Sequence, residues 1–252
     1  MRTDIINHLV SLILNSDKVT SNMTSISLGQ LAQNAENRAE IIKGIDFKSI
    51  SEIFRKPKDD DLRKTIINSG VLDSLFFILD THDLSSVTLP YVDVIQQLSN
   101  CSIEIKLMLQ SKKPYPHLLY LLNHTDNDVI LYAINSIFNI LGFGAKQTSS
   151  SSQHPHFETM STYGGVDKLY SVFKRSDVNK KVKDKAAICI GKLYSSKELQ
   201  GEMKTEIISY LKIQVNSSDS NTKVSSVSTL KGLAQNPENK IEIEKEEFKI
   251  PK

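Results

Sequence analysis

The stretch LAQNAENRAEI, residues 31–41, recurs near the other end of the chain as LAQNPENKIEI, residues 233–243. The match extends outward, because 15 of 37 positions are identical when 5–41 is aligned with 207–243 without a gap. Shared helical composition does not produce identity of this kind between distant segments. The two stretches therefore indicate an internal repeat, and a chain built from stacked structural units.

Further copies of the unit are marked by an aspartate that closes an apolar helix. The markers are separated by 66, 43, 51 and 42 residues, and they are Asp17, Asp83, Asp126, Asp177 and Asp219. After each marker a long helix is expected to end at an apolar residue 14 to 16 positions further on. A period of about 40 residues made of helices alone is typical of helical repeat proteins. The sequence therefore predicts an all-α chain of three-helix units.

The composition agrees with this prediction. Only 10 of 252 residues are glycine and 7 are proline, whereas all-β sandwiches and barrels need many turn residues. Hydrophobic residues make up 39% of the chain, which excludes disorder throughout, and the net charge of +2 excludes a histone-like or acidic-tail protein. Cys101 and Cys189 are 88 residues apart and suggest neither a disulfide framework nor a zinc site. We expect a reducing compartment, the cytoplasm, with the nucleus as the alternative.

Several segments resemble the armadillo repeat family. YAINSIFNILG from Tyr132 and KAAICIGKLYS from Lys185 resemble the third helix of an armadillo repeat, and GGVDKLYSVF from Gly164 resembles its glycine-led second helix. The resemblance implies a right-handed α-solenoid of about five to six armadillo-like repeats over residues 1–248, followed by a tail, 249–252. It also implies a concave groove lined by the third helices.

Local signals predict how the helices begin and where the repeat is irregular. Asn34 and Asn236 are expected to cap short helices, and glycine at the turns permits positive φ. The segment from Asp46 to Gly70 is predicted to contain a second helix followed directly by a first helix, so that one repeat lacks its third helix. Four consecutive serines predict that 146–163 is a flexible surface loop whose part 148–153 is dispensable.

Motifs for catalysis, metal binding or cofactor binding are not found in the sequence. His154 and His156 form an HxH pair, but no further ligand lies nearby in the sequence, so a solvated loop is predicted for them. GFGAKQT from Gly142 lacks the Gly-Lys-Ser/Thr ending of a phosphate-binding loop. Cys189 falls at a small-residue core position. We therefore expect a protein that is not an enzyme and holds neither a metal nor a cofactor.

The predicted groove carries polar side chains along the third helices. They are Asp93, Gln97, Asn135, Asn139, Lys181, Lys185 and Lys192. The amide of Asn139 both donates and accepts hydrogen bonds and so suits the backbone of an extended peptide, although a solvated polar face explains it equally well. The neighbouring lysines favour an acidic peptide. Ile137 and Ile190 are expected on the opposite, buried side.

These observations lead to two hypotheses of function. The first is a non-catalytic scaffold or adaptor that binds a peptide or partner protein in the concave groove. The second is binding of an anionic surface or nucleic acid through residues 174–192, which contain seven basic residues and two aspartates. Nucleic acid is the less expected ligand because aromatic residues are not interleaved with these lysines. No membrane-spanning segment is predicted, and the oligomeric state is left open.

Overall fold

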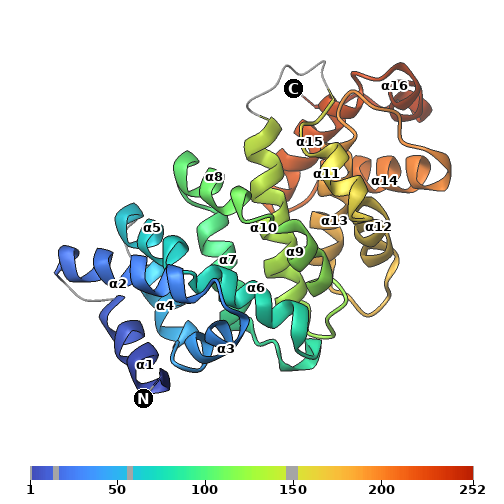
Figure 1. Ribbon diagram of the computed structural model, residues 1–252. Coiled ribbons are helices and arrows are strands. Elements are labelled where there is room, and N and C mark those ends of the chain that lie inside the picture. Colours follow the sequence, from blue (N-terminus) through green and yellow to red (C-terminus); the bar gives the residue numbers. More distant parts are fainter. Residues whose placement is uncertain (1, 14–16, 56–58, 146–152, 252) are drawn as a thin grey trace. The chain divides into compact units, whose positions relative to one another are not determined.

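The computed structural model describes residues 2–13, 17–55, 59–145 and 153–251. Within these ranges every regular element is a helix and no strand is present, as the sequence predicts (Figure 1). The chain forms two compact units, Met1–Tyr120 and Leu121–Lys252. The prediction of one continuous repeat region over 1–248 with a tail, 249–252, stays a prediction.

The first unit consists of short helices joined by tight turns. Its elements are α1 (Arg2–Ile13), α2 (Lys18–Leu31), α3 (Ala35–Lys43), α4 (Phe47–Arg55), α5 (Asp60–Asn68), α6 (Val71–Thr81), the 3-10 turn η1 (Leu84–Ser86), α7 (Leu89–Ser99), α8 (Ile103–Ser111) and α9 (Tyr115–Leu121), whose last residue begins the second unit.

The second unit contains longer helices. Its elements are α10 (Asn127–Ala145), α11 (Phe157–Thr162), α12 (Gly165–Lys174), α13 (Lys180–Leu193), α14 (Gly201–Gln214), α15 (Ser220–Leu233), α16 (Pro237–Glu244) and the 3-10 turn η2 (Lys245–Glu247).

Helices of the first unit pack in register, three positions apart along the chain. α2 packs on α5, α3 on α6, α4 on α7, and α5 on α8. The predicted loss of a third helix between Asp46 and Gly70 is therefore wrong. Each of α2, α3 and α4 packs on the helix three places further along the chain. α4 is therefore equivalent to α7, the third helix of the next group of three.

The second unit has its irregularity near the end of the chain. α10 packs on α13, and α13 packs on α15 (Figure 1). Two helices, α11 and α12, lie between α10 and α13, but in the described stretch from α13 to α15 there is only α14. The last unit thus lacks one helix, and α14 contacts α13, α15 and α16.

The internal sequence repeat is also a repeat of local structure. The side chain of Asn34 accepts hydrogen bonds from the backbone at the start of α3, and Asn236 does the same for α16, with φ and ψ of −92° and 131° against −90° and 128°. Asp17 and Asp219 cap α2 and α15 in the same way. The predicted caps are therefore confirmed, and Pro237 lies at the first helical position, where no N–H is needed.

The turns before the second helices use a left-handed residue. Gly70 precedes α6 with φ of 75°, and Gly164 precedes α12 with φ of 63°. In the segment where prolines replace the glycine, Lys113 adopts φ of 53° instead. Gly44 does not need this freedom, because its φ is −83°.

The serine-rich segment is only partly within the described residues. The predicted flexibility of 148–153 falls almost entirely on 146–152, which lie outside them. Residues 153–163 contain α11, and His154 and His156 are buried, with 4% and 5% of their surface exposed. The prediction of solvated histidines is wrong because both rings pack against the end of α10, where Gly144 leaves space for His156.

The core of the second unit follows the predicted helix faces. Ile137 on α10 and Ile190 on α13 have no exposed surface. Cys189 is also fully buried, and burial raises the pKa of its thiol to about 12. A thiol held protonated in this way is a small hydrophobic side chain rather than a nucleophile.

Candidate functional site

A polar and aromatic surface lies where α10 packs on α13. Asn135, Phe138 and Asn139 are half-buried on one side of α10. From α13, the ammonium of Lys185 lies 4.0 Å from the centre of the Phe138 ring, and that of Lys192 lies 5.3 Å from it. We call these five residues the α10–α13 face.

Helix periodicity explains why these side chains are presented together. On α10 the buried positions Ala133 and Ile137 face the core, so Asn135 and Asn139, one turn apart, emerge on the other side. On α13 the fully buried Ala186 and Ile190 anchor the helix and leave Lys185 to point outward. The prediction that the two lysines lie on the helix next to Asn139 is confirmed.

The electrostatic effect of the lysines reaches neighbouring elements. Hydrogen bonds from Thr222 lower the pKa of Asp219 at the start of α15, and Lys185 and Lys181 lower it further. Lys192 adds a small lowering of the pKa of His154, behind the larger effect of burial. The face therefore combines positive charge, amides that donate and accept, and one aromatic ring.

Two of the predicted groove residues lie elsewhere. Asp93 and Gln97 are on α7 in the first unit, and Asp93 is only 1% exposed. Its carboxylate accepts hydrogen bonds from Ser51, from Arg55 at 2.6 Å and from Gln97 at 3.1 Å. The prediction that Asp93 is an exposed groove residue is wrong, because it ties α7 to α4.

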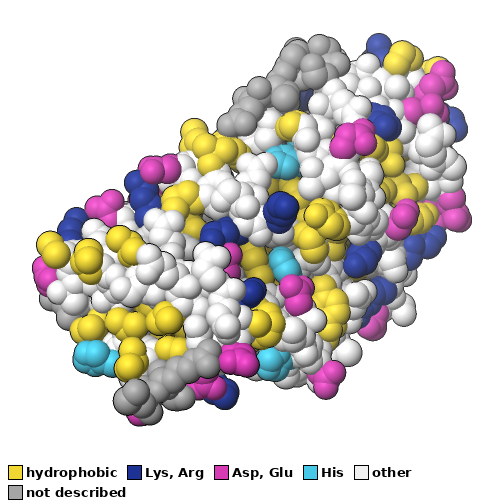
Figure 2. All heavy atoms as spheres, in the orientation of Figure 1, with side chains coloured by type: hydrophobic (Ala, Val, Ile, Leu, Met, Phe, Trp, Pro, Cys, Tyr) yellow, Lys and Arg dark blue, Asp and Glu magenta, His cyan; other side chains and the backbone are white. Residues whose placement is uncertain are grey.

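Much of the basic segment 174–192 is paired within the protein. Lys174 forms an ion pair with Glu206, Arg175 with Asp177 at 2.7 Å, and Lys180 with Asp184 at 2.9 Å. The guanidinium of Arg175 lowers the pKa of Asp177 to about 2. In Figure 2, acidic and basic side chains are interspersed over the surface shown rather than gathered by sign. Asp177 and Asp184 are the two aspartates already counted in the segment, and Glu206 adds one carboxylate from outside it.

Chemically active constellations are not evident in the part of the chain that the structure describes. Three or more His, Cys, Asp or Glu side chains do not converge there on a candidate metal site. The buried Asp184 accepts a hydrogen bond from Tyr210 at 2.8 Å and pairs with Lys180, a network that joins α13 to α14. Burial and this hydrogen bond raise the pKa of Tyr210. The network holds two helices together and is not aimed at a cavity.

Phe138 is the component that sequence reasoning missed. Its helical spacing is that of a core residue, yet it is half-buried and lies beneath two ammonium groups. The available signal was its place on α10, three residues after Asn135 and one before Asn139, which puts it on the same side as both amides.

Comparisons with known proteins concern the fold alone. A crystal structure of an engineered protein from the Northeast Structural Genomics Consortium is similar, with a TM-score of 0.51, 17% identity and coverage of 91% of this chain and 96% of that one. Among the other similar structures, a designed armadillo repeat protein has a TM-score of 0.47 and 14% identity, covering 90% of this chain and 99% of that one. Another, solved in complex with the peptide (KR)4, has a TM-score of 0.46 and 16% identity with the same coverage.

The chain has a helical repeat fold. Its register-preserving packing, α2–α4 on α5–α7, is what such a repeat requires. No protein-family model matches the sequence, and no curated protein matches it. Among the helices of the described ranges, none is long and apolar enough to cross a membrane.

Proposed function

We propose that this armadillo-like protein is a non-catalytic adaptor that binds an extended acidic peptide, or a partner protein that presents one, on the α10–α13 face. The observation that supports the proposal most is the position of Phe138 beneath Lys185 and Lys192, at 4.0 and 5.3 Å. A surface that combines an aromatic ring, two cations and adjacent amides can bind both the side chains and the backbone of a peptide.

The chemistry of the face indicates the ligand. The amides of Asn135 and Asn139 suit the N–H and C=O groups of an extended backbone, which alternate along a peptide. The ammonium groups of Lys185 and Lys192 suit carboxylates, and the ring of Phe138 suits an apolar side chain between them. A peptide with an acidic residue on each side of an apolar one matches the amides, the ammonium groups and the ring together.

Charge reversal tests the proposal. An acidic peptide selected from a random display library on the wild-type chain is labelled with fluorescein and titrated with Lys185→Glu/Lys192→Glu. We expect at least a tenfold loss of affinity and a lower association rate, because charge steers encounter. The matched control is Lys168→Glu/Lys223→Glu, on α12 and α15, which makes the same change in net charge outside the face. Equal losses in both variants contradict the proposal.

Replacing Asn139 is expected to cause a smaller loss of peptide affinity. Loss of one backbone hydrogen bond costs about 0.5 to 1.5 kcal/mol, so Asn139→Ala is expected to weaken the selected peptide about threefold to tenfold. A circular dichroism melt identical to that of the wild type verifies that the fold is unchanged.

Anionic-surface binding through 174–192 is the second candidate, and salt distinguishes it. Binding that neutralises many phosphates weakens steeply between 50 and 200 mM salt, by about 10³ or more, whereas a groove peptide weakens less. The pairing of Lys174, Arg175 and Lys180 with acidic partners disfavours this candidate.

A further inference from the structure

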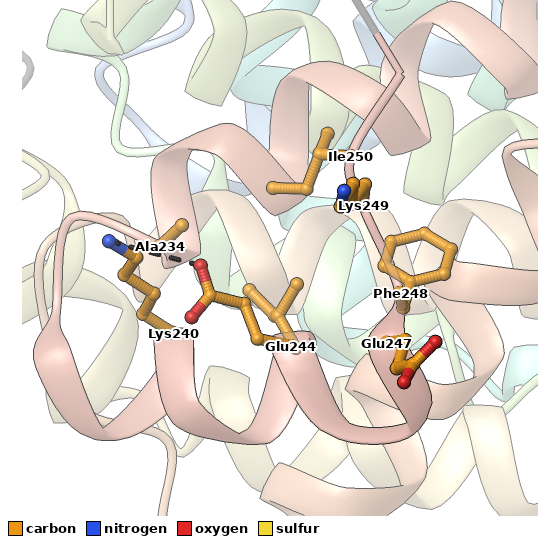
Figure 3. Close-up of a pocket in the computed structure, with 8 residues that line it drawn as sticks. Ala234, Lys240, Glu244, Glu247, Phe248, Lys249 and Ile250 are labelled. Carbon is orange, nitrogen blue, oxygen red and sulfur yellow. Dashed lines mark ion pairs between the residues drawn. The ribbon is translucent and has the colours of Figure 1, made fainter.

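A cavity lies at the end of the second unit, beside α16. Its volume is about 400 Å³. Its walls come from the end of α15, from α16 and from the tail that follows, as Figure 3 shows, and the lining residues that matter here are Ala234, Lys240, Ile243, Phe248 and Ile250. Apolar side chains from three elements, together with charged side chains such as Lys240 and Glu244, thus line a space that stays open.

The internal repeat shows which contacts the equivalent surface makes in the first copy. Ala234 and Lys240 correspond to Ala32 and Arg38 in the first copy, 202 positions earlier. There, α3 is covered by α6. Gly70 lies so close to Ala32 that a Cβ at Gly70 would be 2.3 Å from that of Ala32. The guanidinium of Arg38 lies 5.3 Å from the centre of the Phe77 ring.

In the second copy no helix follows in the described chain to cover the equivalent surface. Ile243, like its counterpart Ile41, is almost fully buried, at 1% and 0% exposure, but Ile241 on α16 remains 60% exposed. The cavity is the place that a helix equivalent to α6 would fill. The sequence keeps alanine at 234 and a cation at 240, the two residue types that contact Gly70 and Phe77 in the first copy.

The tail partly occupies this place. Phe248 and Ile250 lie along the cavity (Figure 3), and the ammonium of Lys212 is 4.9 Å from the centre of the Phe248 ring. The preceding turn is strained, because Glu246 and Glu247 have φ of 59° and 58° although neither is glycine. Displacing the tail from the cavity relieves this backbone strain, which favours an occupant that fits the space better.

The fit is for one helix rather than for a further complete repeat. In the first copy, α5 approaches Gly29 so closely that a Cβ there would be 2.5 Å from the carbonyl oxygen of Asn68. The second copy has Lys231 at this position. Lys231 therefore obstructs a helix placed like α5, whereas Ala234 and Lys240 keep the residue types that contact α6 in the first copy.

We propose that this C-terminal cavity is a docking site for a single amphipathic helix of a partner protein, one that begins with a glycine and carries an aromatic side chain seven residues later, as Gly70 and Phe77 do in α6. The glycine lets the helix start approach Ala234, and the aromatic ring meets Lys240. The tail from Lys245 to Ile250 competes with that helix for the cavity.

The segment that fills this place in the first copy provides the probe. A fluorescein-labelled peptide of residues 69–81, with two lysines appended for solubility, is titrated with the full-length chain and with Phe248→Ser. We expect saturable binding to both, at least threefold tighter to Phe248→Ser because the competing ring is gone. Peptides carrying Gly70→Ala or Phe77→Ala are expected to bind about tenfold more weakly.

A blocking variant locates the binding. Ala234→Phe places a large side chain where the glycine of the helix must approach, so it is expected to abolish binding while its melting temperature stays near that of the wild type. The proposal is overturned if the peptide fails to bind Phe248→Ser, if Ala234→Phe binds as tightly as the wild type, or if both peptide substitutions have no effect. Self-association of Phe248→Ser that Ala234→Phe removes would assign the cavity to a second copy of the chain and also overturn the proposal.

Discussion

Lys113 departs from the repeat pattern, and the departure strains its backbone. It occupies the left-handed position that Gly70 and Gly164 occupy in the equivalent turns, but it carries a side chain that disfavours φ of 53°. The sequence signalled an exception here, because two prolines replace the glycine, but which residue takes the left-handed conformation required the structure.

Replacing Lys113 by glycine is expected to raise the free energy of unfolding by about 0.5 to 1 kcal/mol, because the strain of the left-handed backbone is removed. Gly164→Ala is the reciprocal control. Nothing lies within 4 Å of a Cβ at Gly164, so its expected destabilisation of about 1 kcal/mol reports the backbone alone. Urea unfolding followed by circular dichroism measures both. A Lys113→Gly variant less stable than the wild type contradicts the strain argument.

His154 is a buried titratable residue of the second unit. Its Nε2–H donates to the carbonyl oxygen of Leu141 at 3.0 Å, and its Nδ1 accepts the backbone N–H of His156 at 3.2 Å. Burial lowers its pKa from 6.5 to about 4. Protonation of Nδ1 removes an acceptor inside the core, so the folded state holds the ring neutral.

The sign of the pH effect follows from this lowered pKa. Between pH 4 and 6.5 the unfolded state binds more protons than the folded state, so stability is complete above about pH 6.5 and falls as the pH drops toward 4. The expected loss is about 2 to 4 kcal/mol. Urea midpoints at pH 7.5 and pH 4.5 check this, and His154→Gln is expected to flatten the dependence. Equal pH dependence in the two proteins contradicts the assignment to His154.

At the scale of elements, the sequence predicted local structure well and long-range pairing poorly. The caps at Asn34 and Asn236 and the buried faces of α10 and α13 depend on nearby residues, so spacing and residue type were sufficient to predict them. Whether α4 packs as a second or a third helix depends on its distant partner, α7, which no local pattern specifies. For the same reason Asp93 was assigned to a groove although Ser51 and Arg55, on α4, bury it.

The buried faces of α10 and α13 give a prediction about elements. Ile137→Ala and Ile190→Ala are each expected to lower the free energy of unfolding by about 2 to 5 kcal/mol, because both side chains are fully buried and truncation leaves a cavity. Ser228→Ala, at an exposed position on α15, is the control, with an expected change within about 0.5 kcal/mol. Unchanged urea midpoints in both isoleucine variants would show that these helix faces are assigned wrongly.

At the scale of the molecule, the repeat supplies the scaffold and its departures from regularity supply the candidate sites. The α10–α13 face arises where a third helix carries Asn139 and the next carries Lys185 and Lys192. The C-terminal cavity lies where the second copy of the internal repeat keeps the contact residues of the first, while no helix like α6 covers them in the described residues.

Lysine footprinting tests the central claim, that the α10–α13 face binds an acidic peptide, most directly. The chain is acetylated briefly with and without a saturating amount of the selected peptide, and modification of each lysine is measured by mass spectrometry. We predict that Lys185 and Lys192 become at least fivefold less reactive in the presence of peptide, while Lys168 on α12 and Lys223 on α15 are unchanged. Unaltered reactivity of Lys185 and Lys192 at saturation would contradict the claim.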